Sequence, residues 1–92
     1  MNVFLLVGWR VKQLRLARGL SQDELSSRLG EVTQGYISEL ENGKGNPTLQ
    51  ILYALSRVFG VSLPELVTAD GVPPAVLNTP TQRPSSRMDS TE

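Results

Sequence analysis

The chain has 92 residues and a mass of 10.1 kDa, the size of one small domain. It contains no cysteine and no histidine, which excludes disulfides, thiolate or imidazole metal sites and catalysis by a histidine base. The nine basic and nine acidic residues cancel, with a pI near 6.2, which argues against a nonspecific polyanion binder.

The charge is distributed unevenly along the chain. Residues 1–20 carry four basic residues and no acidic one, whereas residues 21–70 carry three basic and seven acidic residues. This pattern indicates a dipolar domain rather than a broad basic surface. The apolar run Val3–Val7 is too short to span a membrane and lacks the features of a signal peptide. We therefore expect a cytoplasmic protein without a membrane segment.

The first predicted helix covers residues 2 to about 18. Asn2 is suited to cap its start and Gly19 to end it. Its apolar side chains recur at helical spacing, at Val7, Val11, Leu14 and Ala17.

Two short helices follow. Ser21-Gln22-Asp23-Glu24 is a capping box that opens the second helix, which ends at Gly30. The third begins at the cap residue Thr33 and runs to about Glu41, where Asn42-Gly43 stops it. Two short helices joined by a tight turn are the layout of a helix-turn-helix DNA reader, although short helix pairs are common in small all-α domains.

A fourth helix is predicted from Thr48 to Phe59 and a fifth from Ser62 to Val67. The fourth is apolar over more than half of its circumference, which indicates a central position in the bundle. From Asp70 onward proline, serine and threonine dominate. We therefore predict a folded domain over residues 1–69 and a disordered tail over residues 70–92, of which residues 72–77 have the composition to dock on the domain or a partner.

The stretch Arg15–Gly43, with the Asn46-Pro47-Thr48 entry to the fourth helix, resembles the Cro/CI-type helix-turn-helix family of phage repressors and xenobiotic-response regulators. The likeness covers about residues 7–67. It implies an all-α, compact five-helix bundle of the lambda-repressor-like type, with the helix-turn-helix at the second and third helices. It also implies a transcriptional regulator that binds double-stranded DNA, without cofactor, metal or enzymatic activity.

The resemblance makes the third helix the recognition helix, whose outward face reads base edges in the major groove. Candidate base contacts are Gln34, Gly35, Ser38 and Glu39. Gln34 is suited to pair with adenine, or it is an ordinary polar residue of the first turn. Gly35 permits close approach to DNA, or it is simply tolerated. Glu39 accepts from cytosine, or it pairs with a nearby arginine.

The resemblance also implies a set of phosphate contacts, at Gln22, Thr33, Tyr36, Asn42, Gly43 and Lys44. Gln22 lies at a helix start, where free amides and the helix dipole attract phosphate. For Tyr36 the alternative is half-buried packing, and for Lys44 it is a solvated loop position. Arg15 and Glu41 match a structural pair that orients the recognition helix.

The sequence departs from the family pattern in two places. Gly30-Glu31-Val32-Thr33 has one residue more than the usual turn, which we assign to Glu31. Ser26 replaces the usual alanine.

One recognition helix reads few base pairs, so we expect a homodimer on a palindromic operator. The predicted dimer interface comprises Val61, Leu63, Leu66 and Val67, with or without residues 72–77, unless these residues only complete the monomer core. A patch of Phe4, Leu5 and Trp9 is the alternative interface. A repressor is the simplest function. The alternative is an antitoxin-type regulator that also binds a partner protein through its tail.

Overall fold

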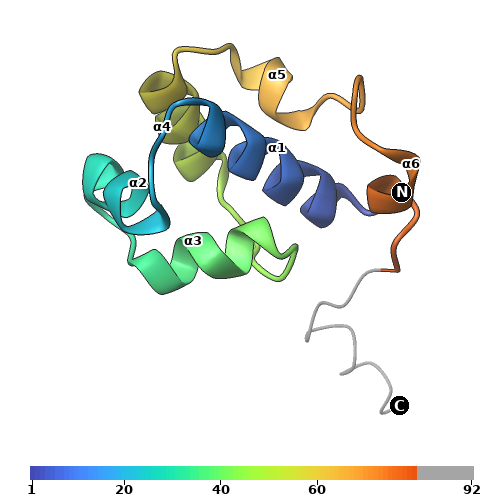
Figure 1. The fold of residues 1–92 in the computed structure, drawn as a ribbon, viewed down its shortest axis with the longest axis horizontal. Coiled ribbons are helices and arrows are strands. Elements are labelled where there is room, and N and C mark those ends of the chain that lie inside the picture. Colours follow the sequence, from blue (N-terminus) through green and yellow to red (C-terminus); the bar gives the residue numbers. More distant parts are fainter. Residues whose placement is uncertain (81–92) are drawn as a thin grey trace.

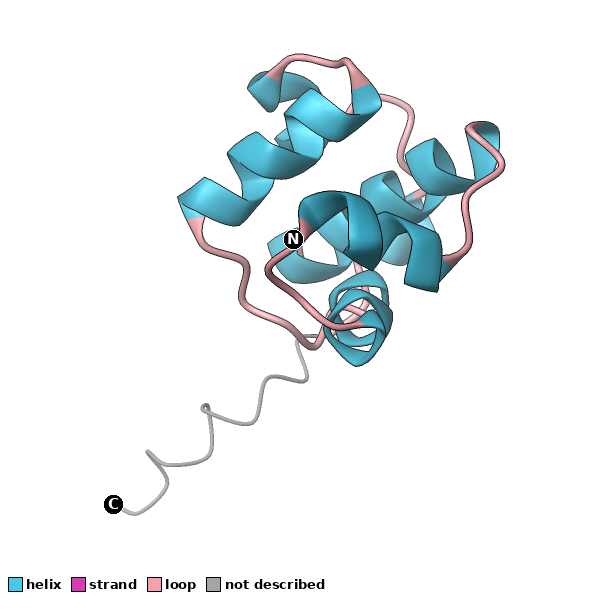
Figure 2. Ribbon diagram, turned by 90° about the vertical axis from the view of Figure 1, so that its left-hand side faces the viewer, coloured by secondary structure: helices cyan, strands magenta, loops and turns pink. Residues whose placement is uncertain are grey.

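The computed structural model describes residues 1–80, and these form six helices and no strand (Figures 1 and 2). The helices pack side against side around one core, with α1 lying above α3 in Figure 1. Their bounds are α1 Val3–Ala17, α2 Gln22–Leu29, α3 Gln34–Glu41, α4 Leu49–Phe59, α5 Leu63–Val67 and α6 Pro74–Leu77. The all-α bundle and its five predicted helices are confirmed, and α6 is additional.

Side-chain caps explain why the helices start where the sequence predicted. The oxygens of Asn2, Ser21, Thr33 and Thr48 each accept a hydrogen bond from an amide in the first turn of the following helix. At α2 and α5 the glutamate three residues on also accepts from the backbone N–H of the capping serine. Gly30 and Gly60 end α2 and α4 in the left-handed conformation.

The core is formed by one apolar residue or more from every helix except α6, together with Val72. Its members bury nearly their whole surface, which is the main source of stability in a domain of this size. The buried apolar residues are Leu6, Val7, Val11, Leu25, Ile37, Leu40, Leu55, Phe59, Leu66 and Val72.

The close packing of α1 against α3 depends on Gly8. A Cβ atom at this position would lie 2.2 Å from the carbonyl oxygen of Leu40 and 2.9 Å from that of Glu41. Only glycine therefore lets the two backbones approach this closely. The contact fixes the end of α3 against the middle of α1.

Residues 70–80 differ from the predicted disordered tail. Val72 is 6% exposed and belongs to the core, and α6 packs against α1. The backbone N–H of Asn2 donates to the carbonyl of Leu77 over 2.8 Å, and the side-chain amide of Asn2 donates to the carbonyls of Thr79 and Pro80. The predicted domain boundary at residue 69 thus falls within the folded unit. The remainder of the predicted tail, residues 81–92, lies outside the described residues.

Candidate nucleic-acid interface

Helices α2 and α3 pack against each other and against the rest of the bundle through one face each. Leu25 on α2 and Ile37 and Leu40 on α3 are at most 1% exposed. In the turn between the helices, Gly30–Thr33, Gly30 takes a left-handed conformation with φ of 80° and ends α2. Val32 then packs against the core and Thr33 caps α3.

The outward face of α3 carries no aliphatic side chain. Gln34, Gly35 and Glu39 are exposed, and Ser38 is half-buried. A Cβ atom built on Gly35 would meet only the Thr33 hydroxyl at 3.8 Å, which is ordinary contact. The fold therefore does not require glycine at this position. The result is a flat, polar helix surface that another molecule can approach closely.

A chain of hydrogen bonds joins this face to the interior. Gln34 donates from Nε2 to Oε1 of Gln22 over 2.7 Å, and Gln22 donates from its own Nε2 to Oε1 of Glu41 over 3.0 Å. Because a carboxylate only accepts, Glu41 turns the amide nitrogen of Gln22 inward and its oxygen outward. The Gln22 oxygen in turn holds the amide nitrogen of Gln34. One N–H and the oxygen of Gln34 stay available.

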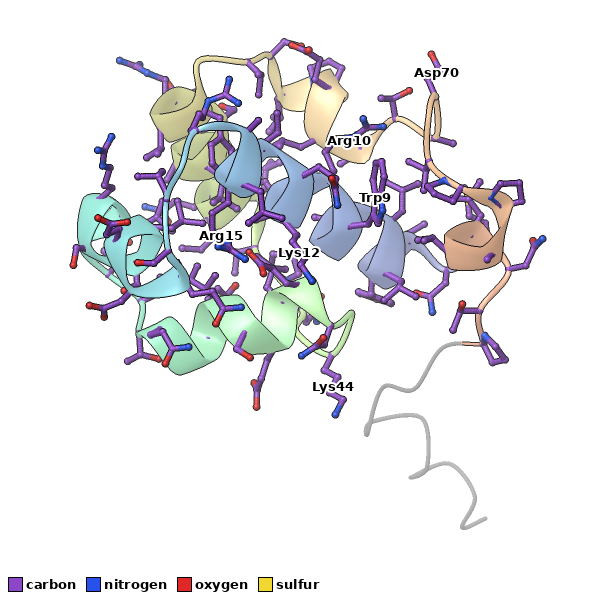
Figure 3. The ribbon with its side chains drawn as sticks, in the orientation of Figure 1. Trp9, Arg10, Lys12, Arg15, Lys44 and Asp70 are labelled. Atoms are coloured by element: carbon purple, nitrogen blue, oxygen red, sulfur yellow. The ribbon has the colours of Figure 1, made fainter. Side chains whose placement is uncertain are left out.

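Glu41 forms an ion pair with Arg15, and both residues are 7% exposed. The Nε and Nη2 atoms of Arg15 donate to the two carboxylate oxygens over 2.7 and 3.0 Å, and Nη1 donates to the carbonyl of Leu20. The hydrogen bond to Glu41 raises the pKa of Arg15. The predicted structural pair is thus formed, and it ties α1 to the end of α3 (Figure 3 labels Arg15).

The predicted phosphate contacts surround this face. Gln22 lies at the start of α2, Thr33 and Tyr36 at the start of α3, and Asn42 and Lys44 after its end. Lys44 points away from the body of the domain (Figure 3). The Tyr36 side chain packs against the core, and this burial raises the pKa of its hydroxyl.

Gly43 does not fit its predicted role. Its only donor is its backbone N–H, which donates to the carbonyl of Leu40 over 3.1 Å, and the residue is buried. Its φ of 75° and the approach of Leu5 make it the left-handed glycine that follows the C-cap Asn42 of α3, a structural role. The amides of Asn42 and Lys44 also donate to carbonyls of α3, so any phosphate contact from this loop must come from side chains.

The interpretation of Glu39 as an arginine partner is not supported either. Among residues 1–80 the ion pair formed is Arg15–Glu41, and the Glu39 carboxylate has no cationic partner. Arg18, the basic residue that ends α1, instead donates to the carbonyl of Phe59 over 2.5 Å. The Glu39 carboxylate therefore faces outward as a free acceptor.

One residue of the predicted dimer surface is interior and three keep some exposure. Leu66 is 0% exposed, and Val61 and Leu63 pack against the core. Leu66 therefore has no surface left for an interface, whereas Val61 and Leu63 remain partly exposed. Val67, at 49% exposed, remains on the surface. It borders an apolar groove of about 230 Å³, whose other walls are Val3, Phe4, Leu6, Val7, Asn46, Pro47 and Leu52.

Two residues that hold the site in place were not among the predicted site residues. Gly8 permits the contact between α1 and α3, and Asn2 joins α1 to residues 77–80. A glycine in the interior of a helix costs about 1 kcal/mol against alanine, and that misfit was the available signal for close packing. Nothing in the sequence indicated the second role of Asn2.

Together the fold and this surface define a DNA-binding class. Two short helices are joined by a tight turn, and the second exposes a polar face on which the Gln34 amide is oriented by a hydrogen bond to Gln22. The Helix-turn-helix family matches residues 11–66, more than half of the chain. The chain belongs to this family of DNA-binding transcriptional regulators, which are not enzymes.

Individual relatives agree with this assignment. An uncharacterized HTH-type transcriptional regulator of Sinorhizobium fredii is 46% identical over 68 residues, which is 74% of this chain and 87% of the relative. The HTH-type transcriptional regulator SinR of Bacillus subtilis is 38% identical and covers 67% of this chain, with 56% of its own length matched.

A solved structure shows the same fold. The restriction-modification controller protein C.AhdI of Aeromonas hydrophila superposes with a TM-score of 0.64 at 30% identity, over 71% of this chain and 94% of that chain. Within the described residues, no helix is long and apolar enough to cross a membrane.

Proposed function

We propose that the protein is a sequence-specific repressor that binds a palindromic operator as a homodimer, with α3 in the major groove of double-stranded DNA. The observation that carries this proposal is the outward face of α3. This face has no aliphatic side chain, and the Gln34 amide on it is oriented through Gln22. A protein of this size represses most simply by covering a promoter in the cytoplasm.

The proposed base contacts follow from the donors and acceptors that the fold leaves free. The oxygen and second N–H of Gln34 match N6 and N7 of adenine. The unpaired carboxylate of Glu39 accepts from N4 of cytosine, and Gly35 allows the groove to come close to the helix backbone. Ser38 adds a hydroxyl at the centre of this face.

The proposed backbone contacts come from residues at both ends of the helix pair. Gln22 has a second N–H on its amide nitrogen, beside the first-turn amides of α2. Thr33, Tyr36, Asn42 and Lys44 border the same face, and their hydroxyl, amide and ammonium groups donate to phosphate. These contacts fix the register of α3 but carry no sequence information.

For the dimer we propose the apolar groove beside Val67 as the interface. Val3 is 48% exposed and Val67 49% exposed, and they stand on the walls of the groove. A twofold pairing buries these side chains on both copies and sets the two α3 helices to read half-sites about one helical turn apart. The partner-protein alternative gains no support from residues 70–80, because they are packed against α1.

Selection from a random duplex library tests the proposal and identifies the operator in the same experiment. The purified protein is expected to enrich a palindromic motif that contains A·T pairs, and fluorescence anisotropy then gives its affinity. Gln34→Ala should weaken binding to that motif and relax the preference at one position in each half-site, by about 1–3 kcal/mol. Gln50→Ala, the same change on an exposed residue of α4, is the matched control.

Each part of the proposal can fail separately. Binding without any enriched motif would contradict sequence-specific reading. An enriched motif with an unchanged preference in Gln34→Ala would show that another residue reads it. A non-palindromic motif would contradict the dimer, and an unaltered size of Val67→Asp in analytical ultracentrifugation would contradict the groove beside Val67 as its interface.

A further inference from the structure

We infer that the groove between α2 and α4 is a docking site for an acidic amphipathic helix of a partner protein. The site is separate from the proposed operator-binding face, since no residue of α3 lines it, and it adds a function to the one proposed above. Three observations carry the inference: the shape of the groove, the apolar and aromatic groups exposed in it, and two arginines that form no ion pair among residues 1–80.

The groove is open and lies between two helices that contact each other at one side of the bundle (Figure 1). Its volume is about 400 Å³. At about 1.5 Å per residue, the eight residues of α2 span about 12 Å and the eleven residues of α4 about 16 Å. A partner helix can therefore lay about two to three turns along the groove.

Apolar groups are exposed along this groove. Its aliphatic lining is only half-buried and consists of Leu29, Ile51, Ala54 and Val58. Tyr53, which also lines the groove, is 53% exposed, and Leu49, one turn earlier on α4, is 70% exposed. An exposed apolar and aromatic surface with polar residues around it is typical of a protein–protein contact site.

Two guanidinium groups give the groove its charge. Arg57 stacks on Tyr53 with its guanidinium carbon 5.9 Å from the ring centroid, and its Nη1 donates to the Tyr53 hydroxyl over 3.0 Å. Arg28, on α2, lies one turn after Glu24, but neither arginine forms an ion pair among the described residues. Glu31, the additional residue of the turn, contributes the single carboxylate of the lining. The groove thus carries a net positive charge, although residues 1–80 as a whole carry seven basic and seven acidic residues.

These features specify the chemistry of the partner. Apolar side chains at positions i, i+3, i+4 and i+7 of a partner helix would cover the aliphatic lining. Carboxylates beside them would accept from Arg28 and from Arg57, whose Nε and Nη2 are not used in its bond to Tyr53. Tyrosine and arginine are also the residue types that most often dominate the energy of a protein interface. A basic helix would be repelled from the same surface.

Calorimetric titration of the full chain with a synthetic helical peptide, with leucine on one face and glutamate on the other, tests the site. This peptide should bind, whereas its counterpart with lysine for glutamate and a peptide of the same composition in shuffled order should not. Arg28→Gln and Arg57→Gln should each weaken binding about two- to fivefold, and Tyr53→Ala about tenfold. Glu31→Gln removes a like charge and should strengthen binding about twofold. Lys12→Gln, which removes one positive charge from an exposed position on α1, is the matched control.

The outcomes distinguish a docking site from other uses of the groove. No binding of the glutamate peptide, or an equal loss of affinity in Lys12→Gln, overturns the inference. A lower salt slope of duplex binding in Arg28→Gln/Arg57→Gln would assign the groove to DNA phosphate, and a smaller species in analytical ultracentrifugation would assign it to a second copy of the chain. Either result overturns the docking site as well. Because the peptide titration contains no DNA, a failure of sequence-specific duplex binding would contradict only the proposed function.

Discussion

Gln22 and Gln34 lie twelve residues apart in sequence, on different helices, and are joined by a hydrogen bond of 2.7 Å between their side-chain amides. The direction of this bond originates at Glu41, which accepts from the nitrogen of Gln22. A buried ion pair on the inner side of α3 thus decides which atoms of an exposed glutamine face outward. The three helices α1, α2 and α3 all contribute to presenting one amide.

This relationship predicts that Gln22 and Gln34 act together in DNA binding. Gln22→Ala should weaken specific binding and also reduce discrimination at the base pair read by Gln34, because the Gln34 amide is then free to rotate. In a double-mutant cycle the two alanine changes should couple by about 0.5–3 kcal/mol. Anisotropy titrations of the four proteins measure this, with Gln22 and Gln50 as a non-contacting control pair. Strict additivity for Gln22 and Gln34 would refute the coupling.

Removing one partner of the buried ion pair should strongly destabilise the domain, whereas replacing both partners by apolar residues should not. Glu41→Gln leaves the Arg15 charge buried without its partner, so the free energy of unfolding should fall by about 3–5 kcal/mol in urea titrations. Arg15→Met/Glu41→Leu removes both charges and should recover most of that loss. If the double variant were as unstable as Glu41→Gln, an unpaired charge would not be the cause.

Two glycines in helices should respond oppositely to the same substitution. Gly8→Ala forces a methyl group into the carbonyls of Leu40 and Glu41, and should destabilise the domain by about 1–3 kcal/mol or prevent folding. Gly35→Ala meets only the Thr33 hydroxyl, at an ordinary contact distance of 3.8 Å, and should stabilise the domain by up to about 1 kcal/mol. Thermal unfolding followed by circular dichroism compares them. If Gly35→Ala raises stability yet weakens binding to the selected duplex, the groove approaches α3 closely at that position.

The capping box of α2 should make stability depend on pH. The backbone N–H of Ser21 donates to Glu24, and this bond lowers the pKa of the carboxyl. A lowered folded-state pKa means that the contribution is fully present above the unfolded value of about 4.3 and is lost as pH falls through the folded value. The difference in Tm between wild type and Glu24→Ala should therefore shrink from pH 6 to pH 3. Gln50→Ala, which removes no titratable group, should show a pH-independent difference.

Much of this molecule is determined locally by its sequence. Caps such as Ser21 and Thr33, and stops such as Gly30, act within one helical turn, so the helix ends were predicted to within about one residue. The outward and inward faces of α3 follow from its period of 3.6 residues. The matching residues between Arg15 and Gly43 were specific enough to predict the family, and the comparisons confirm it.

Other features were decided only when the helices came together. Leu66 and Val67 are adjacent and both apolar, yet α1 and α4 cover one and leave the other at the surface. Gly43 has its N–H bound within α3, and Asn2 contacts the far end of the chain at a separation of 77 residues. Periodicity and capping describe one helix at a time, whereas burial, close backbone approach and hydrogen bonds between distant residues depend on how several helices share one core. The sequence alone therefore determined the helices and their family, and the tertiary packing decided which residues remained free to meet DNA.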